Sequence, residues 1–187
     1  MDAEGGFTWG DAAGGWDVAM IEDAVYRRQD LPRDLEVQVL AFLRMEYPDA
    51  FRGEERFRDR LWDGTTHFVR AAGDVLVSHA MVIPIEVSPD GVPIRIAGVA
   101  SVMTYPQFRR EGHGSGVMRL AGDHIRRGDI GPGMLFCDAP LEPFYARLGW
   151  RSLERGRVLV EGREPDDVVM ILGEPRLPDV LRLDWSW

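Results

Sequence analysis

One stretch of the sequence, Gln107-Phe108-Arg109-Arg110-Glu111-Gly112-His113-Gly114-Ser115-Gly116, decides how the rest of the chain is organised. It follows an apolar run typical of a buried strand, residues 94–104, and it opens an amphipathic helical pattern over residues 114–127. Glycines let a backbone approach an anion closely, and the N-terminus of a helix adds N–H groups and the positive end of its dipole. Strand, glycine turn and helix in this order predict a pyrophosphate-binding site.

The spacing of the glycines excludes two common nucleotide-binding motifs. It is neither the G-x-G-x-x-G of dinucleotide folds nor the G-x-x-x-x-G-K-[ST] of nucleoside triphosphatases, because no Lys-Ser or Lys-Thr follows the last glycine. Glycines that merely tighten a loop are the alternative. The form R-x-x-G-x-G at residues 109–114, followed later by Phe144-Tyr145-Ala146-Arg147-Leu148-Gly149-Trp150, resembles the coenzyme A signature of the GNAT acyltransferase superfamily. The resemblance implies that the turn holds the pyrophosphate of acetyl-CoA.

Within that superfamily the chain is similar to the aminoglycoside 2′-N-acetyltransferases, from about Leu31 to Trp187. The segments that carry this likeness are His67-Phe68-Val69-Arg70, Ser78-His79-Ala80-Met81-Val82-Ile83, the glycine turn, residues 145–150, Pro165-Asp166-Asp167 and Asp184-Trp185-Ser186-Trp187. It implies an α/β (α+β) fold, with a mixed, mostly antiparallel sheet of roughly six to seven strands, about four flanking helices and splayed parallel strands at the acyl-CoA site. It also implies resistance to an amino-sugar antibiotic (an aminoglycoside or a kasugamycin-like compound) by direct acetyl transfer in a ternary complex.

The resemblance assigns roles to individual residues. Tyr145 would protonate the departing coenzyme A thiolate. The backbone of Val102 and Thr104 would pair with pantetheine amides. The residues expected to hold the cofactor are Val102, Met103, Thr104, Arg109, Arg110, Glu111, Gly112, His113, Gly114, Ser115 and Gly116.

Carboxylate side chains are the candidates for the general base and for most of the amine-binding site. Ala100 offers no base, so we name Glu86 as a candidate and leave Asp138, Glu142, a water chain and the terminal carboxylate open. The side chains expected to bind the amine are Asp49, Asp138, Glu142, Asp166, Asp167, Asp184, Trp185 and Trp187. Among other reactive groups, His79 is interpreted as a core histidine and Cys137 as a small buried apolar residue rather than a nucleophile.

Composition limits the class of protein. A chain of 187 residues with 45% hydrophobic content suits one domain, which we expect over residues 21–187 after a flexible tail at 1–20. A single cysteine gives neither an internal disulfide nor zinc spacing, so we expect a cytoplasmic enzyme without a metal. A net charge of −9 favours a small cationic amine over nucleic acid, although the acidity could serve solubility alone. No segment has the pattern of a signal peptide or a membrane span.

Three further points stay open at this stage. The acceptor could instead be another small amine, such as a polyamine or a peptide N-terminus, or the chain could be a coenzyme A-binding module without turnover. A homodimer is compatible with the sequence.

The expected elements are helices at 31–47, 54–61, 114–127 and 141–148, and strands at 66–71, 75–87, 92–104, 134–137, 150–153, 158–160 and 168–172. The three strands between residues 66 and 104 are expected to form an antiparallel meander, in which Pro84 indicates an edge or a bulge. The apolar face of the first helix is expected to consist of Leu35, Val37, Leu40, Ala41, Leu43 and Met45.

Overall fold

The computed structural model describes residues 20–46, 64–87, 93–128, 130–173 and 177–184. Its main element is a seven-stranded sheet in the order β1-β2-β3-β4-β5-β8-β6, beside a two-stranded sheet of β7 and β9. The strands are β1 (Ile21–Arg27), β2 (Thr66–Ala72), β3 (Val75–Val87), β4 (Ile94–Thr104), β5 (Gly133–Cys137), β6 (Arg151–Ser152), β7 (Val158–Val160), β8 (Val168–Leu172) and β9 (Leu181–Leu183). The α-helices are α1 (Arg33–Glu46), α2 (His113–Arg127) and α3 (Glu142–Ala146). This arrangement confirms the predicted mixed sheet.

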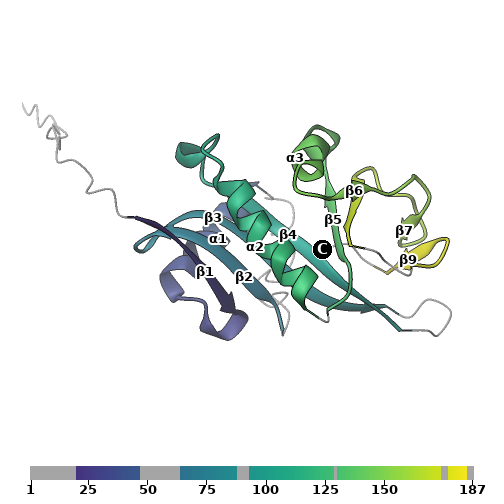
Figure 1. Ribbon diagram of the computed structural model, residues 1–187, viewed down its shortest axis with the longest axis horizontal. Coiled ribbons are helices and arrows are strands. Elements are labelled where there is room, and N and C mark those ends of the chain that lie inside the picture. The colour runs from purple at the N-terminus through teal and green to yellow at the C-terminus, as the bar shows by residue number, and fades with distance from the viewer. Residues whose placement is uncertain (1–19, 47–63, 88–92, 129, 174–176, 185–187) are drawn as a thin grey trace, which may run out of the picture.

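Helices α1 and α2 cover opposite faces of the sheet, and α2 lies in front of the strands in Figure 1. Neighbouring residues of a strand point to opposite faces. Phe68 of β2 packs in the cluster that contains Val117 of α2, whereas the next residue, Val69, packs with Leu35 of α1. A core therefore lies on each side of the sheet.

The predicted antiparallel meander is confirmed in β2, β3 and β4. Pro84, expected at an edge or a bulge, lies in the central strand β3. The pairing of β2 with β3 ends at Thr66 and Val82, so Pro84 pairs only with Ala97 of β4. The missing N–H of this proline therefore falls where, among the described strands, β3 has a neighbour on one side only.

The pairing of β4 with β5 is parallel and short. Only Ala97 with Gly133 and Gly98 with Met134 are in register, after which β5 pairs with β8 on its other side. From Ala100 onward, none of the described strands pairs with the edge of β4 that faces β5. The predicted splay between the two parallel strands is thus present, and it opens toward the glycine turn.

Some predictions about individual elements need correction. Val37 and Met45 were expected in the apolar face of the first helix but are 48% and 73% exposed, while Val39 and Phe42 are buried. Strands β1 and β9 were not predicted. The expected helix at 54–61 and most of the expected tail at 1–20 lie outside the described residues, as do Asp49, Trp185 and Trp187.

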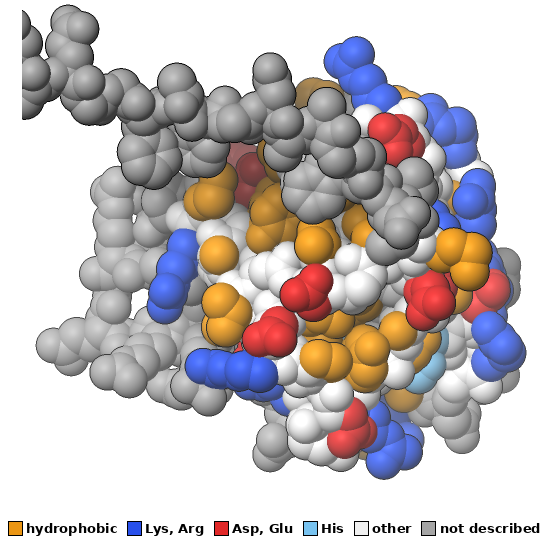
Figure 2. All heavy atoms as spheres, turned by 90° about the vertical axis from the view of Figure 1, so that its left-hand side faces the viewer, with side chains coloured by type: hydrophobic (Ala, Val, Ile, Leu, Met, Phe, Trp, Pro, Cys, Tyr) orange, Lys and Arg blue, Asp and Glu red, His pale blue; other side chains and the backbone are white. Residues whose placement is uncertain are grey.

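Charged side chains of both signs lie on the surface of the described residues. In Figure 2, which faces the left side of Figure 1, the described acidic and basic side chains are interspersed, with hydrophobic side chains between them. The described residues on this face therefore do not form the continuous basic surface that phosphate backbones attract. Within the described part of the chain, no helix combines the length and the apolar character needed to span a membrane.

Candidate active site

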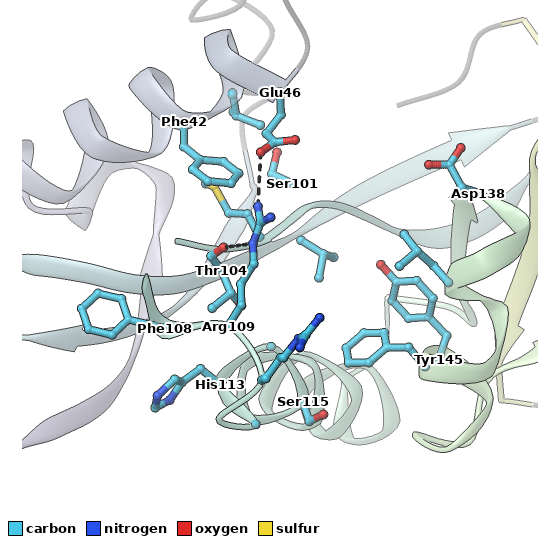
Figure 3. A pocket seen from close by; sticks show the side chains of 18 residues that line it. Phe42, Glu46, Ser101, Thr104, Phe108, Arg109, His113, Ser115, Asp138 and Tyr145 are labelled. Atoms are coloured by element: carbon cyan, nitrogen blue, oxygen red, sulfur yellow. Dashed lines mark hydrogen bonds and ion pairs between the residues drawn. The ribbon is translucent and has the colours of Figure 1, made fainter. Parts of the chain in front are cut away.

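A cavity of about 670 Å³ lies where β4 and β5 separate. Its walls come from four parts of the chain: the end of α1, the end of β4, the glycine turn with the start of α2, and the segment from β5 to α3. The lining residues are Phe42, Leu43, Glu46, Ser101, Val102, Met103, Thr104, Phe108, Arg109, Arg110, Gly112, His113, Gly114, Ser115, Asp138, Leu141, Phe144 and Tyr145. Figure 3 shows Glu46 and Tyr145 on opposite sides of this space.

The end of β4 is distorted where it enters the cavity. The register between β3 and β4 shifts between His79 and Met81, and Ser101 has a φ of 52°, which is the left-handed region. A β-bulge of this kind bends a strand and re-aims the residues that follow it. Beyond the bulge, the Ser78 hydroxyl donates to the Met103 carbonyl at 2.7 Å, which ties this end of β4 back to β3.

Two buried histidines lie beside the bulge. Nδ1 of His79 is 3.0 Å from the carbonyl oxygen of Ser101, and its Nε2 is 3.0 Å from Nδ1 of His67. Both side chains have no solvent exposure. Burial lowers the pKa of His67 to about 4, with help from the charge of Arg28, and lowers the pKa of His79 to about 3, with help from His67. Both rings are therefore neutral near pH 7, and the expectation of a core histidine at position 79 is confirmed.

The glycine turn leads directly into α2. Gly112 is the N-cap, with a φ of 85° that favours glycine, and no side chain caps the helix. The first N–H groups of a helix have no partner within it, so the uncapped start of α2 offers donors to an anion in the cavity. A Cβ on Gly114 would lie 3.2 Å from Oγ1 of Thr104, so this turn packs tightly against β4. Gly116 has another role from Gly114, because Gly116 does not line the cavity and its lack of a side chain leaves room for the Arg70 guanidinium.

Arg109 connects the turn to two other walls of the cavity. Its Nε donates to the Thr104 carbonyl at 3.0 Å, and its Nη2 lies 3.3 Å from Oε1 of Glu46 at the end of α1 (Figure 3). The hydroxyl of Tyr105 ties α1 to the segment after β4 by donating a hydrogen bond to the Gln38 carbonyl at 2.8 Å. Sequence reasoning missed Glu46, because only the folded chain brings the end of α1 to the glycine turn.

Tyr145 supplies a hydroxyl on the far side of the cavity. The residue is 6% exposed, and its ring contacts Phe144 and Trp150 at centroid distances of 4.9 and 6.5 Å. In Figure 3 the hydroxyl points into the space between α3 and β4, with Asp138 nearby. The aromatic contacts fix the ring, so the hydroxyl has a defined position relative to the end of β4.

Carboxylates gather at the end of β5, around Cys137. Asp138 follows β5, Asp167 precedes β8, and the pairing of Cys137 with Val168 brings these two ends together. Burial and the charges of Asp138 and Asp166 raise the pKa of Asp167. Burial and the charges of Asp167, Glu142 and Asp138 raise the pKa of the Cys137 thiol to about 11, so this thiol is protonated at neutral pH and is a poor nucleophile.

The cavity gathers most, but not all, of the residues singled out in the sequence. Of the expected cofactor residues, only Glu111 and Gly116 do not line it. Of the expected acceptor residues that the structure describes, only Asp138 lines it, whereas Glu142, Asp166, Asp167 and Asp184 do not. Glu142 instead accepts a hydrogen bond from Ser152.

Glu86, the first candidate for the base, is far from the cavity. It pairs with Arg95 across the strands, at the opposite end of β3 from Ser78 and Thr104. Eight residue-to-residue steps lead from Ser78 to Glu86 along the strand, which corresponds to about 26 Å. The Glu86 carboxylate is 61% exposed and lies 3.8 Å from Arg95. We therefore do not retain Glu86 as a base.

A family model described as an acetyltransferase (GNAT) domain matches residues 25–153. The match extends over more than half of the chain and includes the glycine turn, the splayed strands and Tyr145. None of the curated proteins matches the chain in sequence.

Solved structures with the same fold include several acyltransferases. An acyl-CoA N-acyltransferase from Pseudomonas aeruginosa has a TM-score of 0.61 at 16% identity, over 82% of this chain and 100% of that chain. Escherichia coli ElaA has a TM-score of 0.58 at 19% identity, over 83% and 100%. An aminoglycoside 6′-N-acetyltransferase complexed with coenzyme A has a TM-score of 0.61 at 13% identity, over 81% and 99%. At these identities the likeness is one of fold.

Proposed function

The chain belongs to the acetyltransferase (GNAT) family, and on that premise we propose that it transfers the acetyl group of acetyl-CoA to an amino group of a cationic amino sugar. The observation that carries the proposal is the cavity itself. One wall holds the uncapped start of α2 and the open edge of β4, and the opposite wall holds Tyr145 and Asp138. Groups that bind a phosphorylated acyl donor and groups that move protons therefore face one space.

The residues present fit acetyl-CoA. The N–H groups at the start of α2 suit a pyrophosphate, and Arg109 and Arg110 add positive charge to the same wall. The edge of β4 from Val102 to Thr104 offers backbone groups to the pantetheine amides. When bound, acetyl-CoA supplies a thioester carbonyl that an amine can attack without any covalent intermediate on the protein.

The protein must then supply three groups for the acetyl transfer. A backbone N–H after the bulge of β4 stabilises the charge that develops on the carbonyl oxygen. Tyr145 donates its hydroxyl proton to the departing thiolate. Asp138 accepts the proton of the amine, because among the described residues that line the cavity the only other carboxylate, Glu46, is already paired with Arg109.

Electrostatics support a cationic acceptor. Burial is the main cause of the raised pKa of Asp167, and the charge of Asp138 adds to it, so the two carboxylates repel each other and a cation placed between them would relieve the repulsion. The resemblance to aminoglycoside 2′-N-acetyltransferases supports an amino sugar, with antibiotic resistance as the result. The same resemblance assigns Asp184, Trp185 and Trp187 to the acceptor site, but Asp184 does not line the cavity and the two tryptophans lie outside the described residues.

The decisive experiment measures release of coenzyme A thiol from acetyl-CoA with a panel of acceptors. We expect turnover with aminoglycosides or kasugamycin-like amino sugars, and a KM for the amine that rises with salt because charge pairs are screened. Turnover only with polyamines or peptide N-termini would retain the enzyme and reject the amino sugar. Binding of acetyl-CoA without turnover on any acceptor would favour a coenzyme A-binding module.

A pair of variants tests whether Asp138 acts as the base. Asp138→Asn should lower kcat at neutral pH, whereas Glu86→Gln, a control at the remote end of β3, should leave it unchanged. An equal effect of both substitutions would refute the role of Asp138.

A further inference from the structure

Ser101, which lines the cavity at the end of β4, is held in a strained backbone conformation. Its φ of 52° is unusual for a residue with a side chain, and such residues persist only where their surroundings hold them. Ser101 lies at the register shift between β3 and β4. Among the described hydrogen bonds, the one that a side chain makes to the Ser101 carbonyl comes from His79, at 3.0 Å.

The two contacts of His79 define which of its nitrogens carries the proton. A carbonyl oxygen only accepts hydrogen bonds, so Nδ1 of His79 carries the proton and donates to Ser101. In the neutral ring Nε2 is then an acceptor, and Nδ1 of His67, 3.0 Å away, must be the donor to it. This leaves Nε2 of His67 as a bare acceptor, in agreement with its lack of a partner among the described residues. His67 therefore fixes the tautomer that His79 needs.

We propose that His79, with its tautomer fixed by His67, is a positioning residue that aims the N–H of Val102 at the reacting carbonyl. The peptide between Ser101 and Val102 is trans, so its C=O and N–H point in opposite directions. A hydrogen bond that holds the Ser101 oxygen against buried His79 directs the Val102 N–H away from that histidine. Val102 lines the cavity, and this N–H becomes the donor to the thioester oxygen. The inference rests on the proposed acetyl transfer.

Two substitutions of His79 separate this role from simple packing. The terminal amide nitrogen of asparagine falls where Nδ1 of histidine lies, and that of glutamine falls where Nε2 lies. His79→Asn therefore retains a donor to Ser101 and loses the contact with His67, whereas His79→Gln retains the contact with His67 and loses the donor to Ser101.

The expected result is a difference in kcat between the two variants. Removing one oxyanion donor typically lowers kcat about 10²–10³-fold. We expect a loss of this order in His79→Gln and a loss of less than about tenfold in His79→Asn, with KM for the amine and binding of acetyl-CoA unchanged in both. Equal losses in the two variants, or a larger loss in His79→Asn, would overturn the proposal.

A measurement on the unaltered protein covers the case in which a variant does not fold. The ¹⁵N chemical shifts of the histidine rings report which nitrogen is protonated, and we expect Nδ1 to carry the proton in both His67 and His79. Protonation of His79 at Nε2 would contradict the proposal, whatever the kinetics of the variants.

Failure of this inference can be told apart from failure of the proposed function. The infrared band of the carbonyl in ¹³C-labelled acetyl-CoA should move to lower frequency on binding to the Tyr145→Phe protein, and should move less in the double variant Tyr145→Phe, His79→Gln. Equal shifts in the two proteins would refute only the role of His79. If acetyl-CoA does not bind to the unaltered protein, the proposed function itself fails.

Discussion

Acid should destabilise this protein through its two buried histidines. Burial lowers the pKa of His67 to about 4 and of His79 to about 3, whereas an unfolded chain titrates near 6.5. Below pH 6.5 the unfolded state thus binds more protons than the folded state, so the contribution is fully present above that pH and is lost as the pH falls toward the folded values. At pH 5, about 1.5 units below the unfolded pKa, each ring lowers the free energy of unfolding by about 2 kcal/mol.

Urea unfolding followed by tryptophan fluorescence at pH 8 and pH 5, at constant ionic strength, measures this loss. Other groups contribute to it, so the test is a comparison with His79→Asn, which keeps a donor for the Ser101 carbonyl but does not titrate. The variant should lose about 2 kcal/mol less than the parent between the two pH values. The reasoning is refuted if both proteins lose the same free energy of unfolding over this interval.

Three further predictions concern the cavity and the buried cysteine beside it. Gly114→Val should weaken the binding of acetyl-CoA, as measured by calorimetry, because a Cβ at this position would lie 3.2 Å from Oγ1 of Thr104 and the added methyl groups would extend into the cavity wall. An unchanged affinity would show that the glycine turn does not bind the cofactor. Tyr145→Phe should lower kcat about 10²–10⁴-fold with little change in the Kd for acetyl-CoA; parental turnover in the folded variant would exclude Tyr145 as the acid. Cys137, whose pKa is raised to about 11, should resist iodoacetamide at pH 8, and Cys137→Ala should retain turnover; rapid alkylation of the folded protein would contradict this.

The sequence was informative where local periodicity and the final structure agree. The strand at 75–87 and the glycine turn before α2 have clear signals, namely a period of two and a change to a period near 3.6. The first helix was also predicted, and its buried face was predicted only in part, because Leu35 and Leu43 are buried as expected whereas Val37 and Met45 are exposed. Val37 and Met45 are as apolar as Val39 and Phe42, and only the position of the sheet determines which of them are covered.

Long-range pairing explains what could not be predicted. His67 and His79 lie on different strands, and their contact depends on the register of β2 against β3. The bulge at Ser101 has no local sequence signal, because serine has no special preference for the left-handed region. Glu46 reaches Arg109 only after α1 has packed on the sheet. Each of these features is a product of tertiary structure.

Three departures from regular structure coincide at the cavity, and together they account for its existence. The parallel ladder of β4 and β5 stops after Gly98 and Met134, Ser101 adopts a left-handed conformation, and α2 begins without a side-chain cap. A strained residue costs about 1–3 kcal/mol, and glycine at an N-cap costs about a few tenths of a kcal/mol relative to a capping side chain. Regular pairing of β4 with β5 would close the gap, and a capping side chain at Gly112 would occupy the donors at the start of α2. The same departures that lower stability therefore leave backbone donors available on two adjacent walls, which is the condition for holding an acyl donor along β4.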